Sequence, residues 1–166
     1  MNKIIEITTY IGVALAIWVI SPLLGKFLDS LYFNPGMLGS SALITIVGVF
    51  IILLGTLLAI WTVYLLKAKG KGTPNPKLPP KEFVVTGPYR FSRNPMALGG
   101  FLVLLGEAVV YYSPSLLGIS LLYCLIIYCN AVFVEEPELQ KRFGESYEDY
   151  LKQVPRLFPN PWKRLK

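Results

Sequence analysis

The amino-acid sequence predicts an all-α, multi-pass membrane protein with four transmembrane helices, a cytoplasmic connector and a C-terminal helical segment. Two observations lead to this fold class. Of the 166 residues, 54% are hydrophobic and only 16% are charged, whereas an ordinary soluble domain carries about 25% charged residues. In addition, four apolar stretches approach or reach the length of about 20 residues that a helix needs to cross a bilayer. The length suits a single domain over residues 1–166.

The four apolar stretches run over residues 4–24, 37–66, 95–112 and 115–134. The first lacks a small-residue cleavage site and is long for a signal-peptide core, so a membrane span is favoured over a cleaved signal peptide. The second carries no charge and is long enough to span with tilt. The loop between the third and fourth stretches is very short and uncharged, so these two helices are expected to form an antiparallel hairpin.

Basic residues predict which side of the membrane each loop faces. Most of the 16 lysines and arginines lie in two segments, residues 67–93 and 141–166. Cytoplasmic loops carry such an excess of basic residues, so we expect both segments and both termini to be cytoplasmic, in an inner or equivalent membrane. Lys26 is then the one lysine outside. Because the charge is confined to two segments between apolar runs, membrane lipids are the expected partner and nucleic acid is disfavoured.

The chain has no histidine and only two cysteines. Imidazole is therefore excluded as a general base, a proton shuttle or a metal ligand. Cys124 and Cys129 lie in an apolar run and form neither a CxxC pair nor a set with zinc-ligand spacing. We therefore expect no metal site.

Proline, glycine and asparagine shape the predicted cytoplasmic segments. Residues 67–81 hold four prolines and two glycines, which predicts an extended basic connector. Asn94-Pro95 is typical of a helix start, with the asparagine as N-cap and the proline in the first helical position. Ser146 and Asp149 resemble a capping box that would restart a helix after Gly144. The apolar residues that predict helical pieces here are Leu139, Phe143, Tyr147, Tyr150, Leu151 and Val154.

The predicted hairpin brings several chemically distinctive groups to one membrane face. The start of the third span, with Arg93 and Asn94, and the end of the fourth, with Glu135 and Glu136, must lie on the same side. A helix N-terminus beside arginines favours an anionic group, whereas paired carboxylates favour an ammonium group or a ribose diol. S-adenosylmethionine carries all of these groups. A phosphate headgroup would also fit.

Four motifs in this region resemble those of the integral-membrane methyltransferases, a group that holds isoprenylcysteine carboxyl methyltransferases and phospholipid N-methyltransferases. The resemblance covers roughly residues 72–160, and the order and spacing of the motifs agree. The motifs are Gly-Pro-Tyr-Arg-Phe-Ser-Arg-Asn-Pro-Met at 87–96, Glu-Glu at 135–136, Phe-Gly-Glu-Ser-Tyr-Glu-Asp-Tyr at 143–150 and Val-Pro-Arg-Leu-Phe-Pro at 154–159.

The resemblance implies a helical membrane enzyme that binds S-adenosylmethionine at its cytosolic side and takes a lipophilic small-molecule or lipidated substrate from the bilayer. It implies a cofactor-site region at about 82–100 and 131–158. The cofactor-binding residues would be Gly87, Tyr89, Arg93, Asn94, Pro95, Met96, Glu135 and Glu136. Catalytic roles fall to Arg156 and Glu136. Substrate contacts would come from Tyr147, Tyr150 and Arg156.

Two positions depart from the family pattern. The family usually has histidine where this chain has Asn94, and tyrosine where it has Ala97. Asparagine still offers a hydrogen-bond donor and an acceptor, but it carries neither a charge nor a stacking ring. The cofactor site could therefore be kept while the substrate differs.

The chemistry of the acceptor is narrowed but not fixed by the sequence. Methyl transfer needs alignment and exclusion of water more than proton transfer, which suits a chain without histidine. A carboxylate or thiolate acceptor needs no base, whereas an amine must first lose a proton. A carboxylate-type acceptor is therefore favoured over phospholipid amine methylation. A non-catalytic lipid-binding or assembly protein on the same scaffold is the alternative of a different class.

The third span holds an unexpected charge. Glu107 lies within it, where an unpaired charge costs on the order of 2.5 kcal/mol or more. It could be protonated, paired, near the outer interface or lining a substrate tunnel. Gly99, Gly100 and Gly106 on the same helix predict close packing against a neighbouring helix.

Overall fold

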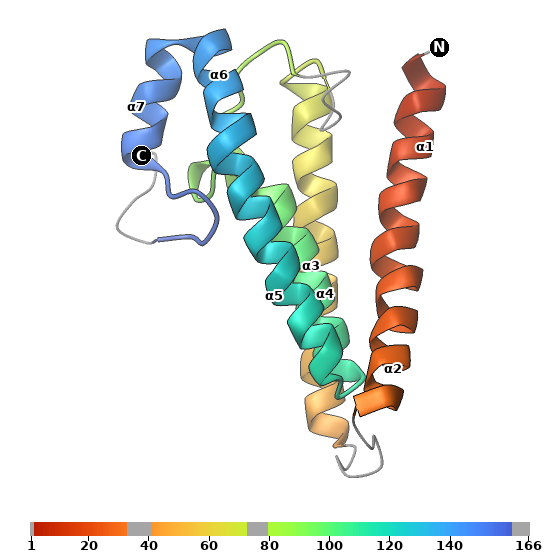
Figure 1. The fold of residues 1–166 in the computed structure, drawn as a ribbon. Helices are drawn as coiled ribbons and strands as arrows, with labels where there is room; N and C mark the ends of the chain where they lie inside the picture. Colours follow the sequence, from red (N-terminus) through yellow and green to blue (C-terminus); the bar gives the residue numbers. More distant parts are fainter. Residues whose placement is uncertain (1, 33–40, 73–79, 161–166) are drawn as a thin grey trace. The chain divides into compact units, whose positions relative to one another are not determined.

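The structure, a computed structural model, describes residues 2–32, 41–72 and 80–160 and is all-helical in these ranges, as the sequence predicted. Figure 1 shows the helices in chain order. The long ones are α1 (Asn2–Leu15), α2 (Ser21–Tyr32), α3 (Ala42–Ala68), α4 (Pro95–Val110) and α5 (Pro114–Asn130). The short ones are η3 (Gly87–Arg90), α6 (Glu136–Phe143) and α7 (Glu145–Gln153). Two π-turns, η1 (Ala16–Ile20) and η4 (Ala131–Glu135), join α1 to α2 and α5 to α6.

Three continuous helices in the described ranges are long and apolar enough to cross a membrane: Ile7–Tyr32, Ala42–Ala68 and Pro114–Phe143. The third predicted span, residues 95–112, is the shorter apolar helix α4, with 16 residues. The helices that contain the first and fourth predicted spans continue beyond residues 24 and 134, to Tyr32 and Phe143. The ends of the spans themselves stay a prediction. The predicted start of the second span, at residue 37, lies outside the described residues.

Each π-turn ends two residues before a proline. The backbone N–H of Ser21 bonds to the Ala16 carbonyl, five residues back, and Pro22 follows. The N–H of Glu136 bonds to the Ala131 carbonyl in the same way, ahead of Pro137. A proline inside a helix lacks the N–H and crowds the carbonyl four residues earlier. A wider turn relieves that crowding, so the helix continues through the proline.

The chain divides into two compact units, Met1–Leu57 with Gly99–Tyr123 and Leu58–Leu98 with Cys124–Lys166. The expectation of a single domain stays a prediction. In the first unit, α3 and α4 approach each other at glycines. A Cβ atom added at Gly106 would lie 2.8 Å from the Gly48 carbonyl oxygen, and one added at Gly55 would lie 2.6 Å from the Gly99 carbonyl oxygen. The close packing predicted from the α4 glycines is confirmed.

The start of α5 in the first unit is capped from α2. Asp29 accepts hydrogen bonds from the Ser115 N–H, at 3.0 Å, and from the Ser113 hydroxyl. Ser113 in turn accepts the Leu116 N–H at 3.0 Å. Both Asp29 and Ser113 are buried. These contacts bind the first N–H groups of the helix, which have no partner within it.

Glu107 is buried and has a hydroxyl partner. Its Oε2 lies 3.0 Å from the Oγ of Ser21, and the same Oγ lies 2.5 Å from the Ile17 carbonyl oxygen. A hydroxyl has one hydrogen to donate. Both contacts are satisfied when Ser21 donates to the Ile17 carbonyl and accepts a hydrogen bond from a protonated Glu107. This hydrogen count favours a protonated, paired Glu107 among the roles that the sequence left open.

Glu107→Gln is expected to change the free energy of unfolding by less than about 1 kcal/mol, because a neutral amide can donate to Ser21 as the protonated carboxyl does. Glu107→Asp is the matched control: its shorter side chain cannot make this contact and should cost about 1–3 kcal/mol. Thermal unfolding in detergent, followed by far-ultraviolet circular dichroism, compares the two. A loss with glutamine as large as that with aspartate would mean that a charge is needed at this position.

Candidate functional site

The 3-10 turn η3 lies against the end of α3 in the second unit. It begins at Gly87, whose φ of +62° favours glycine. A Cβ atom added there would lie 2.7 Å from Leu65 Cδ1 and 3.3 Å from the Trp61 ring. Pro88 follows and is buried. Glycine is therefore required here both by the backbone conformation and by the lack of space.

The start of α4 is capped as predicted. Asn94 Oδ1 accepts the Ala97 N–H at 3.3 Å, and Pro95 is the first helical residue. A later segment of the chain lies against this start. The Pro155 carbonyl accepts the Arg93 N–H at 3.0 Å, and the Arg156 carbonyl accepts the Asn94 N–H at 3.1 Å. Residues 155 and 156 are thereby fixed beside the first residues of α4.

An aromatic cluster supports the turn from α7. Tyr150 donates its hydroxyl hydrogen to the Tyr89 carbonyl at 2.7 Å, with the Ser92 carbonyl 3.3 Å away. The Phe83 ring contacts the ring of Tyr150 edge-on at 5.1 Å between centroids and that of Tyr147 at 5.6 Å. Tyr147 is 1% exposed and Tyr150 is 4% exposed. The structure gives both tyrosines a packing role, and the predicted substrate contact stays a prediction.

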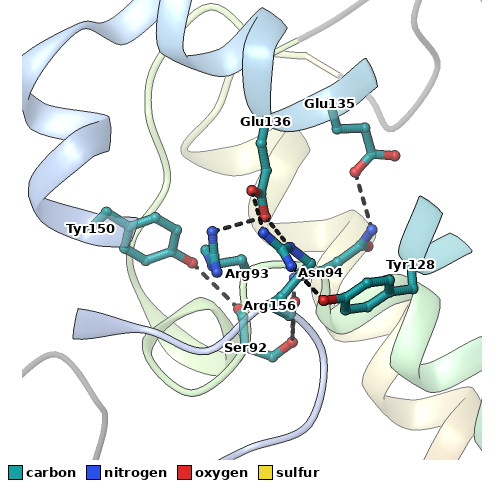
Figure 2. Close-up of polar contacts among 8 residues, drawn as sticks. All are labelled: Ser92, Arg93, Asn94, Tyr128, Glu135, Glu136, Tyr150 and Arg156. Atoms are coloured by element: carbon teal, nitrogen blue, oxygen red, sulfur yellow. Dashed lines mark hydrogen bonds and ion pairs between the residues drawn. The ribbon is translucent and has the colours of Figure 1, made fainter. Parts of the chain in front are cut away.

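One carboxylate holds two arginines at the centre of the site (Figure 2). Glu136 Oε1 accepts from Arg93 Nη1 at 2.8 Å and from Arg156 Nε at 2.6 Å, and Glu136 Oε2 accepts from Arg156 Nη2 at 2.9 Å. The Glu136 side chain is 14% exposed. Arg156 also donates to the Tyr128 hydroxyl at 2.7 Å, with its guanidinium carbon 4.9 Å from the ring centroid. Paired contacts of this kind fix both the position and the orientation of a guanidinium group.

The neighbouring carboxylate, Glu135, is held by two neutral amides. Its Oε1 accepts from Asn130 Nδ2 at 2.7 Å, and its Oε2 accepts from Asn94 Nδ2 at 3.1 Å. Figure 2 shows that the side chains of Glu135 and Glu136 contact different residues. The predicted proximity of the third span's start to the fourth span's end is confirmed by these contacts.

A model of the phospholipid methyltransferase family matches residues 43–146, more than half of the chain. The chain belongs to this family. The match covers η3, the start of α4 and both glutamates, and it ends before Tyr150 and Arg156.

Individual proteins similar to this family member carry several names. A methanethiol S-methyltransferase of Crocosphaera subtropica is 27% identical over 89% of this chain and 52% of its own length. A phosphatidylethanolamine N-methyltransferase of Pyricularia oryzae is 33% identical over 45% of this chain and 8% of its own length. The nickel-cobalt-cadmium resistance protein NccN of Alcaligenes xylosoxydans xylosoxydans is 31% identical over 47% of this chain and 36% of its own length. The chain thus spans about half or less of the length of these curated relatives.

A solved structure with a similar fold is that of the eukaryotic intramembrane Ras methyltransferase ICMT, isoprenylcysteine carboxyl methyltransferase. The match covers 96% of this chain and 55% of that one, with a TM-score of 0.62 and 20% identity. At this level of identity the likeness shows a shared fold. It supports the all-helical membrane architecture that the sequence predicted.

Most of the predicted site residues of this family member lie in one network. Contacts connect Arg93, Asn94, Glu135, Glu136 and Arg156, while Gly87 and Tyr89 belong to the adjoining turn. Pro95 is buried at the helix start, and Met96 is half-buried. Sequence reasoning missed Asn130, Tyr128 and Ser92. A proline directly after the glutamate pair was the available signal for Asn130, because it predicts a distorted helix turn there.

Burial keeps the tyrosines of the site protonated. It raises the pKa of Tyr147 to about 12, with a further contribution from the Glu136 charge. Burial likewise raises the pKa of Tyr89 and of Tyr150 above the ordinary value. The hydrogen bond to Glu136 raises the pKa of Arg156. These tyrosines therefore act as neutral hydrogen-bonding and packing groups at neutral pH.

Alkaline pH is expected to destabilise this unit. Tyr147 has an ordinary pKa of 10.0 and a folded-state pKa of about 12, so the unfolded chain loses this proton first. Its stabilising contribution is complete below pH 10 and is lost as the pH rises to about 12. Unfolding followed by circular dichroism between these values should show the loss, and Tyr147→Phe should reduce it. Ionisation of Tyr147 near pH 10 in folded protein, measured as the absorbance difference from that variant, would contradict this.

Proposed function

We propose that the protein transfers a methyl group from S-adenosylmethionine to a lipophilic acceptor at the cytoplasmic membrane face. One observation carries this proposal: Arg93, Glu136, Arg156 and Glu135 are held together at the start of α4 in a chain of the phospholipid methyltransferase family. The distribution of lysine and arginine supports an inner membrane with both termini in the cytoplasm.

The residues of the site suit a methyl donor that carries both an anionic and a cationic group. Arg93 and Arg156 share the single negative charge of Glu136, so the arginine pair retains positive charge that suits an anionic group. The Glu135 carboxylate is bonded by neutral amides, so its negative charge suits a cationic group. The residues that would hold the cofactor are Gly87, Tyr89, Arg93, Asn94, Pro95, Met96, Glu135 and Glu136. When bound, S-adenosylmethionine supplies an electrophilic methyl group on a sulfonium.

The protein's own contribution is alignment and exclusion of water. Two arginines fixed on Glu136 and a capped helix start form a preorganised surface, which is how positioning lowers a barrier. The Arg156 side chain is 26% exposed, against 13% for Arg93. The acceptor would therefore approach on the side of Arg156 and Tyr128. Tyr147 and Tyr150 pack behind this surface. We propose that their effect on the substrate is indirect, because they hold the surface in place.

A carboxylate-type acceptor fits these groups best. The tyrosines of the site have a raised pKa, so at neutral pH they are poor bases for an ammonium group. A carboxylate needs no base, and Arg156 offers a matching charge. Phospholipid amine methylation is the second candidate, favoured by the family description and by the similarity to a phosphatidylethanolamine N-methyltransferase. Lipid binding without catalysis is the third.

Labelled methyl groups distinguish these functions. Cells that express the protein or its Glu136→Ala variant are fed methionine with an isotopically labelled methyl group. The lipids and lipidated proteins of their membranes are then analysed by mass spectrometry. A methyl ester releases labelled methanol on treatment with base, whereas an N-methyl group does not. Label that appears only with the parent protein supports catalysis. No label, together with no titratable binding of S-adenosylhomocysteine to folded protein, would overturn it.

A further inference from the structure

The geometry points to Asn130 as a positioning residue for the Glu135 carboxylate, placed there by the π-turn η4. This inference rests on the proposed function and deepens it, because it says how the cation-binding group of the proposed cofactor site is held. Asn130 lies at the end of α5, in an apolar helix, and has no role in the motifs that carry the family resemblance.

The π-turn is what brings Asn130 and Glu135 together. Five residues along a regular α-helix correspond to about 140° of rotation between side chains, so the two would point apart. Here the Glu136 N–H bonds to the Ala131 carbonyl, five residues back, because Pro137 disturbs the regular pattern. The wider turn reduces the rotation between residues five apart, and Asn130 Nδ2 lies 2.7 Å from Glu135 Oε1.

A second amide holds the other oxygen of the same carboxylate. Asn94 Oδ1 accepts the Ala97 N–H as a helix cap, so its Nδ2 must face Glu135 Oε2, 3.1 Å away. The cap therefore fixes which end of the Asn94 amide the carboxylate meets. With one amide on each oxygen, the plane of the Glu135 carboxylate is set from two directions. Figure 2 draws the contact with Asn94.

Neutral donors leave the Glu135 charge for a ligand. Glu136, one residue along, is bonded by two guanidinium groups, so its charge is compensated within the protein. Amide donors orient Glu135 without compensating its charge. A carboxylate that is oriented in this way is preorganised for a cation. Removing the Asn130 amide should therefore weaken binding of a cationic ligand while leaving the arginine contacts of Glu136 intact.

Calorimetric titration of detergent-solubilised protein with S-adenosylmethionine and with S-adenosylhomocysteine tests this inference. Asn130→Ala is expected to weaken binding of both by about 10- to 100-fold, the effect of losing one hydrogen bond to a charged group. Cys129→Ala, a change at the adjacent exposed residue, is the matched control and should bind as the parent does. In a Glu135→Gln background, Asn130→Ala should have little further effect.

Asn130→Asp adds a readout that a purely structural role would not produce. Two adjacent carboxyl groups share a proton at low pH, so this variant should bind well near pH 5, when the new carboxyl can donate, and poorly near pH 8. The readout is the affinity of the variant relative to that of the parent at the same pH, which should be higher near pH 5 than near pH 8. Circular dichroism melting confirms that each variant is folded.

The outcomes separate this inference from the proposed function. If the parent binds ligand and both Asn130 variants bind within twofold of it at each pH, Asn130 does not position Glu135, while the methyltransferase proposal stands. If folded parent protein binds neither S-adenosylmethionine nor S-adenosylhomocysteine, the proposed function fails, and this inference fails with it.

Discussion

Glu136→Ala should reduce binding of S-adenosylhomocysteine by at least about 100-fold and abolish methyl transfer. This carboxylate holds Arg93 and Arg156 together, and all three side chains are mostly buried. Removing one partner of a buried ion pair costs about 3–5 kcal/mol, because the remaining charges are left uncompensated; partial exposure here places the expected effect near the lower value. Calorimetric titration measures the loss of ligand binding, and thermal unfolding in detergent measures the loss of stability.

Glu138→Ala is the matched control for Glu136→Ala. Glu138 lies on the same helix and pairs with Arg142 at 3.7 Å, but its side chain is 52% exposed. Exposed pairs of this kind contribute about 0–1 kcal/mol, so both binding and stability should stay near those of the parent. Equal losses from the two substitutions would show that α6 tolerates no change, and unchanged binding in Glu136→Ala would show that the ligand lies elsewhere.

Gly55→Ala is expected to lower the unfolding temperature by roughly 3–10 °C, the shift produced by about 1–3 kcal/mol of overpacking in a chain of this size. The added Cβ would lie 2.6 Å from the Gly99 carbonyl oxygen and 2.9 Å from the Val103 nitrogen. Both are backbone atoms, so no side-chain rotation relieves the clash, and α3 and α4 must separate. Thermal unfolding in detergent measures the shift.

Gly118→Ala provides the opposite case. A Cβ atom there meets nothing within 4 Å, and alanine favours a helix over glycine by up to about 1 kcal/mol. This variant should be as stable as the parent or slightly more so. If Gly55→Ala were equally well tolerated, the two helices would not pack through their backbones at this position.

Much of the fold follows from patterns that are local in the sequence. Apolar stretches of sufficient length predicted the helices, and Asn94-Pro95 predicted the start of α4, because an N-cap needs only its own next few residues. The capping box at Ser146 was wrong: α7 already begins at Glu145, and the Ser146 hydroxyl donates to the Phe143 carbonyl. The positive φ of Gly144 ends one helix and begins the next without a side-chain cap.

The contacts of the site depend on residues far apart in the chain, and these could not be predicted individually. The sequence placed both glutamates beside the start of α4 but treated them as an equivalent pair. In the structure Glu136 takes both arginines, one of them 43 residues earlier and the other 20 residues later. Glu135 takes two amides instead. That division depends on the wider helix turn before Pro137. The proline signals a distorted turn, but packing determines which side chains the turn brings together.

The bonds between Arg93-Asn94 and Pro155-Arg156 have a consequence for biosynthesis. Arg156 is synthesised 64 residues after Ser92, its hydrogen-bonding neighbour. At about 5–20 residues per second, the earlier half of the site waits roughly 3–13 s for its partner. Glu136 is itself made 43 residues after Arg93 and only 20 residues before Arg156. Arg156 is therefore the last group of the network to be made, and the network closes only after α5 and α6 have been synthesised.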